Sequence, residues 1–112
     1  MSYHKESHIR LASLCRSLGH PSRIALLEKL AVSGVCIQGD IVEVEHLSEV
    51  TVIKHLRGLM QHGILKGNLN RSKLSYCIDH EKLDEFKILF DELYSQVKQH
   101  QEEVTIHKGK CT

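Results

Sequence analysis

The sequence predicts a mainly α-helical domain with one small β-hairpin and a long closing helix. Through most of the chain, apolar residues recur three and four positions apart, which is the period of an amphipathic helix. Residues 64–78 differ, because two short runs of strand-forming residues flank a polar turn there. The composition agrees with a folded domain, since 41% of the residues are hydrophobic, 26% are charged and one is proline.

The 112 residues suffice for one domain with a modest core, which we place at about residues 9–100. The polar segment 101–112 is expected to be a flexible tail. No apolar run has membrane-spanning length, and the first residues lack the apolar stretch of a signal peptide. A cytoplasmic protein without membrane contact is therefore expected, with its four cysteines reduced.

The first half of the chain should contain three helices before the best-defined one. The first covers about residues 5–18 and ends at Gly19. The second begins at Pro21, because proline at the first helical position gives up an amide that has no partner in any case. A short third helix is expected over residues 37–44. The apolar face of the second helix is expected to consist of Ile24, Leu27, Leu30 and Ala31.

The next helix, from Ser48 to Gly63, has the clearest pattern in the sequence. Ser48 can cap its first turn, and Gly63 can adopt the left-handed conformation that ends a helix. Its apolar stripe consists of Val52, Leu56 and Leu59, and its opposite face of Val50, Thr51, Lys54 and Arg57. A short helix with a basic, hydroxyl-bearing face suits the major groove of DNA. The same pattern is also typical of ordinary surface helices, so the flanking elements must decide between a DNA-binding helix and an ordinary one.

Two strands and a long helix complete the chain. Residues 64–69 and 73–78 are expected to form a hairpin with a basic tip at residues 70–72. By parity, Leu74, Tyr76 and Ile78 share one face of the second strand, and Ser75 and Cys77 share the other. The helix expected from residue 80 to about residue 100 carries the apolar residues Leu83, Phe86, Phe90, Leu93, Tyr94 and Val97.

Charge is segregated along the chain although its formal total is only +1. From Lys54 to Ile78 there are five basic residues and no acidic one, whereas Asp79–Glu103 contains eight acidic and three basic residues. One positive face is what binding to a polyanion requires. Solvated charged faces without a partner remain the alternative.

The expected order α-α-α-α-β-β-α, with a basic hairpin tip, is that of a winged helix-turn-helix. In that fold one helix enters the groove while the hairpin, called the wing, meets phosphate. The residues expected to contact double-stranded DNA are Ser48, Glu49, Val50, Thr51, Lys54, His55, Arg57, Arg71 and Lys73. Apolar residues on both terminal helices exceed what one small domain can bury, so a homodimer and a palindromic operator are expected.

Two segments resemble the signatures of the ArsR-type winged-helix repressors. Leu18–Leu27 (Leu-Gly-His-Pro-Ser-Arg-Ile-Ala-Leu-Leu) resembles their second helix, and Leu47–Arg57 resembles their recognition helix, with Ile53 where the family usually has serine. The resemblance implies a dimeric bacterial repressor that leaves its operator when a metal or metalloid binds or when its thiols are modified. A regulator that is constitutive or answers to another signal, or a helical protein-interaction module, are the alternatives.

The resemblance also directs attention to metal ligands. Zinc sensors of the family use Asp-x-His and His-x-x-Glu on the last helix; His100 and Glu103 match the second pair, but Lys87 and Leu89 occupy the first. Arsenic sensors often carry Cys-x-Cys near the third helix, and here Cys36 retains the first cysteine alone.

The sequence therefore predicts a thiol-based switch that takes a thiophilic metal or metalloid ion. Cys36, which would precede a helix start, and Cys111, on the tail, are the main candidates. Cys36 could equally be a small buried hydrophobe. Cys15 on an apolar stripe and Cys77 in a strand are expected to be structural, and with His100 and Glu103 they form the weaker candidates. No local signature of a catalytic nucleophile with its base is present, so no enzymatic activity is expected.

Overall fold

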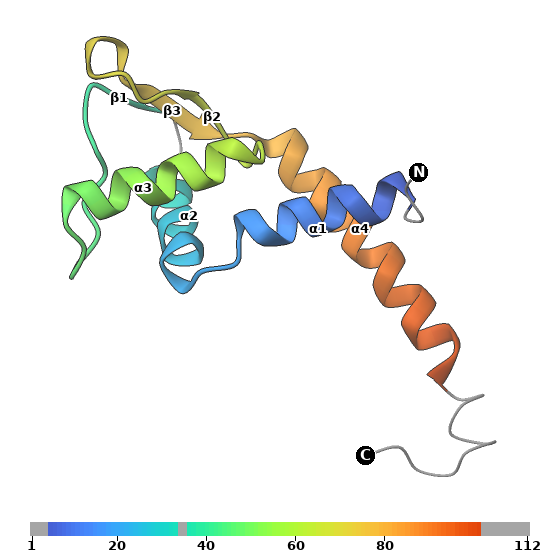
Figure 1. Ribbon diagram of the computed structural model, residues 1–112. Helices are drawn as coiled ribbons and strands as arrows, with labels where there is room; N and C mark the ends of the chain where they lie inside the picture. Colours follow the sequence, from blue (N-terminus) through green and yellow to red (C-terminus); the bar gives the residue numbers. More distant parts are fainter. Residues whose placement is uncertain (1–4, 34–35, 102–112) are drawn as a thin grey trace.

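The computed structural model describes residues 5–33 and 36–101. Within them it contains four α-helices, a three-stranded sheet and a 3-10 turn (Figure 1). The elements are α1 (Glu6–Ser17), α2 (Pro21–Ser33), β1 (Ile37–Gln38), α3 (Glu49–Gln61), β2 (Leu65–Asn68), η1 (Arg71–Lys73), β3 (Ser75–Ile78) and α4 (His80–Gln99). The mainly helical winged fold is therefore confirmed, and the predicted hairpin is the β2–β3 pair.

The prediction of a helix over residues 37–44 is wrong. Ile37–Gln38 forms a short edge strand that pairs antiparallel with β3, so the sheet order is β1-β3-β2. Gly39 follows with φ 73°, outside the helical region, and its amide donates to the Leu74 carbonyl at 2.8 Å. Backbone groups that a helix would pair internally are thus paired with the sheet. The β-branched residues of the segment, Ile37, Ile41, Val42 and Val44, also favour extended backbone.

The core lies between α2, α3 and one face of the sheet, and α3 contributes most clearly to it. The expected stripe Val52, Leu56 and Leu59 is buried. From the sheet side it meets Ile64, Leu65 and Tyr76, which are also buried. Tyr76 and Cys77 were expected on opposite faces of β3. Tyr76 faces this core, and Cys77 is only half-buried, in agreement with that expectation.

Both expected ends of α3 are confirmed. The Ser48 side chain accepts a hydrogen bond from the Thr51 amide at 3.2 Å, which satisfies one orphan donor of the first turn. After the last turn, Gly63 has φ 87°, in the left-handed region that favours glycine. These local signals fix where the helix begins and ends.

The faces expected for the first two helices need correction. In α2, Leu26 and Leu30 are buried, whereas Ile24 is 46% exposed and Ala31 is exposed. In α1, Leu14 and Ser17 are buried and Cys15 is exposed, so the expected core packing of Cys15 is wrong. Each short helix offers two overlapping apolar stripes. Contacts with α3 and α4 select the buried stripe of α1, and contacts with α3 and β3 select that of α2.

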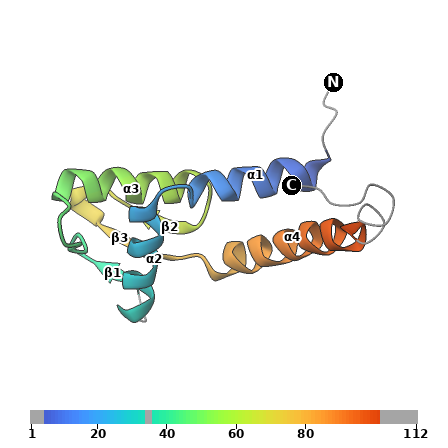
Figure 2. The same cartoon turned by 90° about the horizontal axis from the view of Figure 1, so that it is seen from below.

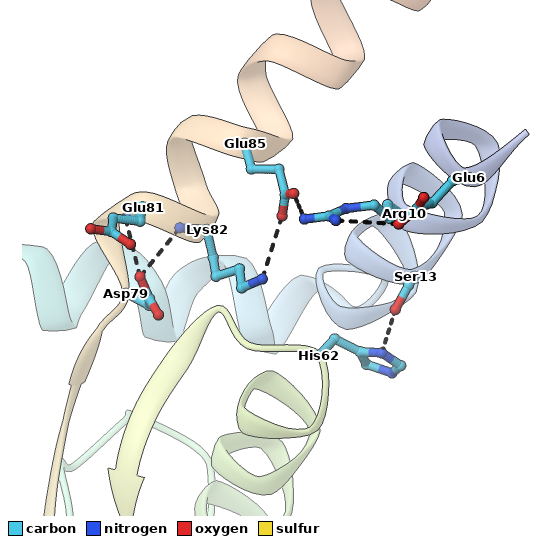
Figure 3. Close-up of polar contacts among 8 residues, drawn as sticks. All are labelled: Glu6, Arg10, Ser13, His62, Asp79, Glu81, Lys82 and Glu85. Carbon is cyan, nitrogen blue, oxygen red and sulfur yellow. Dashed lines mark hydrogen bonds and ion pairs between the residues drawn. The ribbon is translucent and has the colours of Figure 1, made fainter.

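Helix α4 extends away from the sheet, and α1 runs alongside it (Figure 2). Arg10 of α1 forms an ion pair with Glu85 of α4, and Ser13 is 2.7 Å from the His62 ring nitrogen (Figure 3). From Phe90 to residue 101 every residue is exposed. In the described part of the chain, no helix is long and apolar enough to cross a membrane.

Candidate nucleic-acid interface

The outer face of α3 is a row of small, hydroxyl-bearing and basic side chains. Val50 is 78% exposed, Lys54 and Arg57 are exposed, and Thr51 is half-buried. The Thr51 hydroxyl lies 3.0 Å from that of Ser48, which holds both at the start of the helix. This face offers a methyl surface, hydroxyl groups and two cations, the groups that contact bases and phosphates in a major groove.

The inner side of α3 is held by α2 through a polar contact that the sequence did not reveal. Arg23 of α2 donates from Nε to Nδ1 of His55 at 3.2 Å and from its guanidinium to the Ser17 carbonyl at 3.1 Å. The His20 and His55 rings lie 4.5 Å apart between centroids. Gly58 allows the contact, because a Cβ there would lie 2.4 Å from the Arg23 guanidinium. The paired helices therefore keep a fixed separation.

His55 was expected among the DNA-contacting residues, but the structure places it elsewhere. Its side chain is only 8% exposed and packs between the two helices. Burial lowers the pKa of His55, and electrostatic interactions with His20, Arg23 and Lys54 lower it further. His55 thus accepts the Arg23 hydrogen bond as a neutral ring, and its position on α3 faces α2 because the helix turns it away from Val50 and Lys54.

The wing carries its cations on a short 3-10 turn. Asn70 caps this turn by accepting from the Ser72 amide at 3.2 Å, and Arg71 and Lys73 are exposed. Gly67 lets the hairpin twist, since it has φ 132° and a Cβ there would lie 2.1 Å from the Ser75 carbonyl oxygen. The wing therefore presents two basic side chains at the end of a stiff, capped loop.

An ion pair joins the wing to the start of α3. The Arg71 guanidinium contacts the Glu49 carboxylate, and both side chains are largely exposed. Glu49 and Arg71 were each expected to contact DNA, and the structure pairs them with each other. Exposed pairs of this kind contribute little stability, about 0–1 kcal/mol. A phosphate can therefore replace Glu49 as the partner of Arg71 at small cost.

The cysteines differ most from expectation. Cys36 and Cys77 form a disulfide with their Cα atoms 4.4 Å apart, so the expectation that all cysteines are reduced is wrong. Cys36 precedes the strand β1, and the helix start that was to activate it is absent. The sheet decides this pairing. The register that aligns Ile37 with Tyr76 places Cys36 opposite Cys77.

Of the remaining switch candidates, two lie in the described part of the chain. Cys15 is a free, exposed thiol on α1. His100 is exposed just after α4, while Glu103 and Cys111 lie outside the described residues. Among the residues that the structure describes, no group of three or more histidine, cysteine or acidic side chains could hold a metal ion.

The packing of α3 against α2, the exposed basic face of α3 and the basic wing define a winged-helix protein. No family model matches the chain. The chain is similar to the arsenical resistance operon repressor of Staphylococcus xylosus, with 28% identity over 78 residues, which are 70% of this chain and 74% of the relative. This similarity agrees with the resemblance to ArsR-type repressors.

Proposed function

We propose that the protein is a transcriptional repressor that binds a specific site on double-stranded DNA. The observation that carries this proposal is the outer face of α3, where Val50, Lys54 and Arg57 are exposed beside the cations of the wing. Glu49 is the one acidic residue in this stretch, and it is paired. The name of the relative, a repressor of an arsenical resistance operon, supports repression as the outcome of binding.

In this proposal α3 reads base edges and the wing contacts phosphate. Val50 and Thr51 sit at the first turn of α3, the end of a recognition helix that approaches the bases. Lys54 and Arg57 lie one and two turns further along the exposed face, where they can contact guanine edges or phosphates. Arg71 and Lys73 fix the register on the duplex without reading sequence.

The repressor acts as a homodimer on a palindromic operator. The second half of α4 exposes Phe90, Leu93, Tyr94 and Val97, and α1 exposes Ile9. An apolar row of this length on a small domain favours a two-fold partner. A dimer then spaces two α3 helices along the duplex, as a palindrome requires. Such a protein acts in the cytoplasm, where it meets chromosomal DNA.

Release from the operator is proposed to follow binding of a thiophilic ion to the reduced thiols. The relative's name connects it with arsenical resistance, and trivalent arsenic is a soft ion that thiolates prefer. Cys36 is the candidate that lies within the described fold, and Cys111 remains the second candidate. A constitutive regulator is the alternative, and it would show no change of operator affinity with thiophilic ions.

The experiment is selection of binding sites from random duplex DNA, followed by titration of the selected duplex. Lys54→Ala and Arg57→Ala are expected to lose discrimination against mutated sites by about 1–3 kcal/mol for each specific contact removed. Lys29→Gln, which removes one exposed charge from α2, is the matched control and should bind like the parent. Failure to enrich any sequence, together with intact dimers in sedimentation, would favour the protein-interaction module instead.

A further inference from the structure

The two bonded cysteines occupy facing positions on neighbouring strands. The β1–β3 register pairs Ile37 with Tyr76 and Gln38 with Ser75, and the next pair towards the start of β1 is Cys36 with Cys77. Gly39 and Leu74 are joined by a backbone hydrogen bond, so alternation along the ladder makes Cys36 and Cys77 a non-hydrogen-bonded pair. In such pairs the Cα atoms lie closest, and the 4.4 Å between these two suits a disulfide.

The bond is open to reagents. Cys36 is exposed and Cys77 is half-buried on the outer face of the sheet. Both line a cavity of about 370 Å³ that Lys66 and His80 also line. Lys66 lies directly opposite Cys77 on β2, and a cationic neighbour favours the reactive thiolate of a cysteine. The pair is therefore accessible and, once reduced, well placed to be oxidised again.

The bond also closes a loop that contains the whole DNA-reading part of the fold. Cys77 lies 41 positions after Cys36, and the chain between them includes α3 and the wing. The segment from Cys36 to α3 is attached to the sheet at few points: the two-residue strand β1, the Gly39 amide, and the Tyr76 hydroxyl, which lies 3.1 Å from the Asp40 carbonyl oxygen and 2.9 Å from the Val42 amide. The segment then leads directly to Ser48, the cap of α3.

We propose that Cys36 and Cys77 form a redox-active pair, in which oxidation to the disulfide by a peroxide strengthens operator binding and reduction weakens it. The proposal rests on the proposed function, because operator binding is what the pair regulates. It assigns Cys77, which the sequence predicted to be structural, as the partner of Cys36. The partner comes from the sheet register, which brings the two sulfurs together within one chain.

The chemistry balances with a peroxide as oxidant. The Cys77 thiolate attacks one peroxide oxygen, the O–O bond breaks, and an alcohol or water leaves with Cys77 as the sulfenic acid. The Cys36 thiol then attacks the Cys77 sulfur, the S–S bond forms, the S–O bond breaks and water leaves. Two electrons pass from the two thiols to the peroxide. A dithiol reductant returns them by exchange through a mixed disulfide.

Oxidation favours binding because it holds the segment before α3 in place. Without the bond, a two-residue edge strand has few ladder hydrogen bonds to keep it on β3. The segment then spends part of its time detached from β3. If only the attached form binds the operator, the apparent affinity equals the intrinsic affinity multiplied by the attached fraction. A fall of that fraction to between about one-third and one-tenth weakens the apparent affinity roughly three- to tenfold.

The experiment uses the full chain with Cys15 and Cys111 changed to serine, so that Cys36 and Cys77 are the remaining two of its four cysteines. One sample is reduced with dithiothreitol and another is oxidised with hydrogen peroxide. Alkylation followed by mass spectrometry counts free thiols, and fluorescence anisotropy measures the affinity for a selected duplex. We expect the peroxide to remove both thiols together and the oxidised chain to bind roughly three- to tenfold more tightly.

Cys36→Ser and Cys77→Ser should bind the duplex as weakly as the reduced parent does, both with dithiothreitol and with hydrogen peroxide. If either serine variant fails to fold, Cys36→Ala replaces it, and the comparison of the two parent samples needs no substitution at the pair. Thiols that stay free in peroxide, or equal affinities of the oxidised and reduced parent, overturn the proposal while the proposed function stands. If the thiols pair but neither form binds any duplex, the proposed function is wrong and this regulation is wrong with it.

Discussion

Replacing Tyr76 by phenylalanine removes one hydroxyl group from the core of the sheet. The Tyr76 side chain is fully buried, and its hydroxyl donates to the Asp40 carbonyl at 3.1 Å and accepts from the Val42 amide at 2.9 Å. The pKa of Tyr76 is raised, chiefly by burial, so the hydroxyl stays protonated and can donate at neutral pH. This one group holds the chain that leads into α3.

The cost of the substitution can be worked from these contacts. Phenylalanine keeps the ring and its packing, so no cavity forms. The Val42 amide and the Asp40 carbonyl lose a partner in a partly buried place, at about 1–1.5 kcal/mol each, which gives about 2–3 kcal/mol in total. For a domain of this size that corresponds to a fall in Tm of about 8–12 °C.

Urea denaturation and thermal melting, both followed by circular dichroism, measure this loss. Tyr94→Phe is the matched control, because Tyr94 is 55% exposed on α4 and its change should stay within about 0.5 kcal/mol. A Tyr76→Phe protein as stable as Tyr94→Phe would show that the hydroxyl does not hold the segment. The reasoning about the chain between β1 and α3 would then be refuted.

Three further perturbations address the reading face. Gly58→Ala should destabilise the fold by about 1–2 kcal/mol in urea denaturation, although alanine is the better helix former. The reason is that the alanine Cβ displaces the Arg23 guanidinium from two hydrogen bonds. Unchanged stability would show that Arg23 moves aside without loss. Arg71→Ala should weaken binding to all duplexes alike and reduce the salt dependence by about one unit of slope, and a changed base preference would contradict its role at phosphate. In the folded protein the pKa of His55 lies below its ordinary value of 6.5, so as the pH falls the unfolded chain binds a proton at His55 before the folded protein does. The stability of the fold should therefore decrease as the pH drops below about 6.5. His55→Gln should reduce this pH dependence. Parallel pH profiles for the parent and His55→Gln would remove His55 from the explanation.

Local signals allowed several elements to be predicted from the sequence. The cap at Ser48, the stripe from Val52 to Leu59 and the left-handed Gly63 fix α3, because each acts within a few residues of the chain. The hairpin and α4 follow from the same kind of local period. The exposed basic face of α3 was predicted with them, since the apolar stripe determines which side remains in solvent.

Contacts between distant residues decided what the sequence could not. Residues 37–38 form a strand only because β3 offers them an edge, and that register places Cys36 opposite Cys77. The same holds for His55, which turns to Arg23 and away from the exposed face of α3 because α2 packs against α3.

The sequence by itself determined the class of fold and the helix with the exposed basic face, because helix caps and apolar periods depend on neighbouring residues. Only the tertiary structure decided which apolar stripe of α1 and α2 is buried, which charges pair and which cysteines meet. The physical reason is that burial and pairing depend on the partner surface. For Cys36, for Arg71 and for His55, that partner lies at least 22 residues away along the chain.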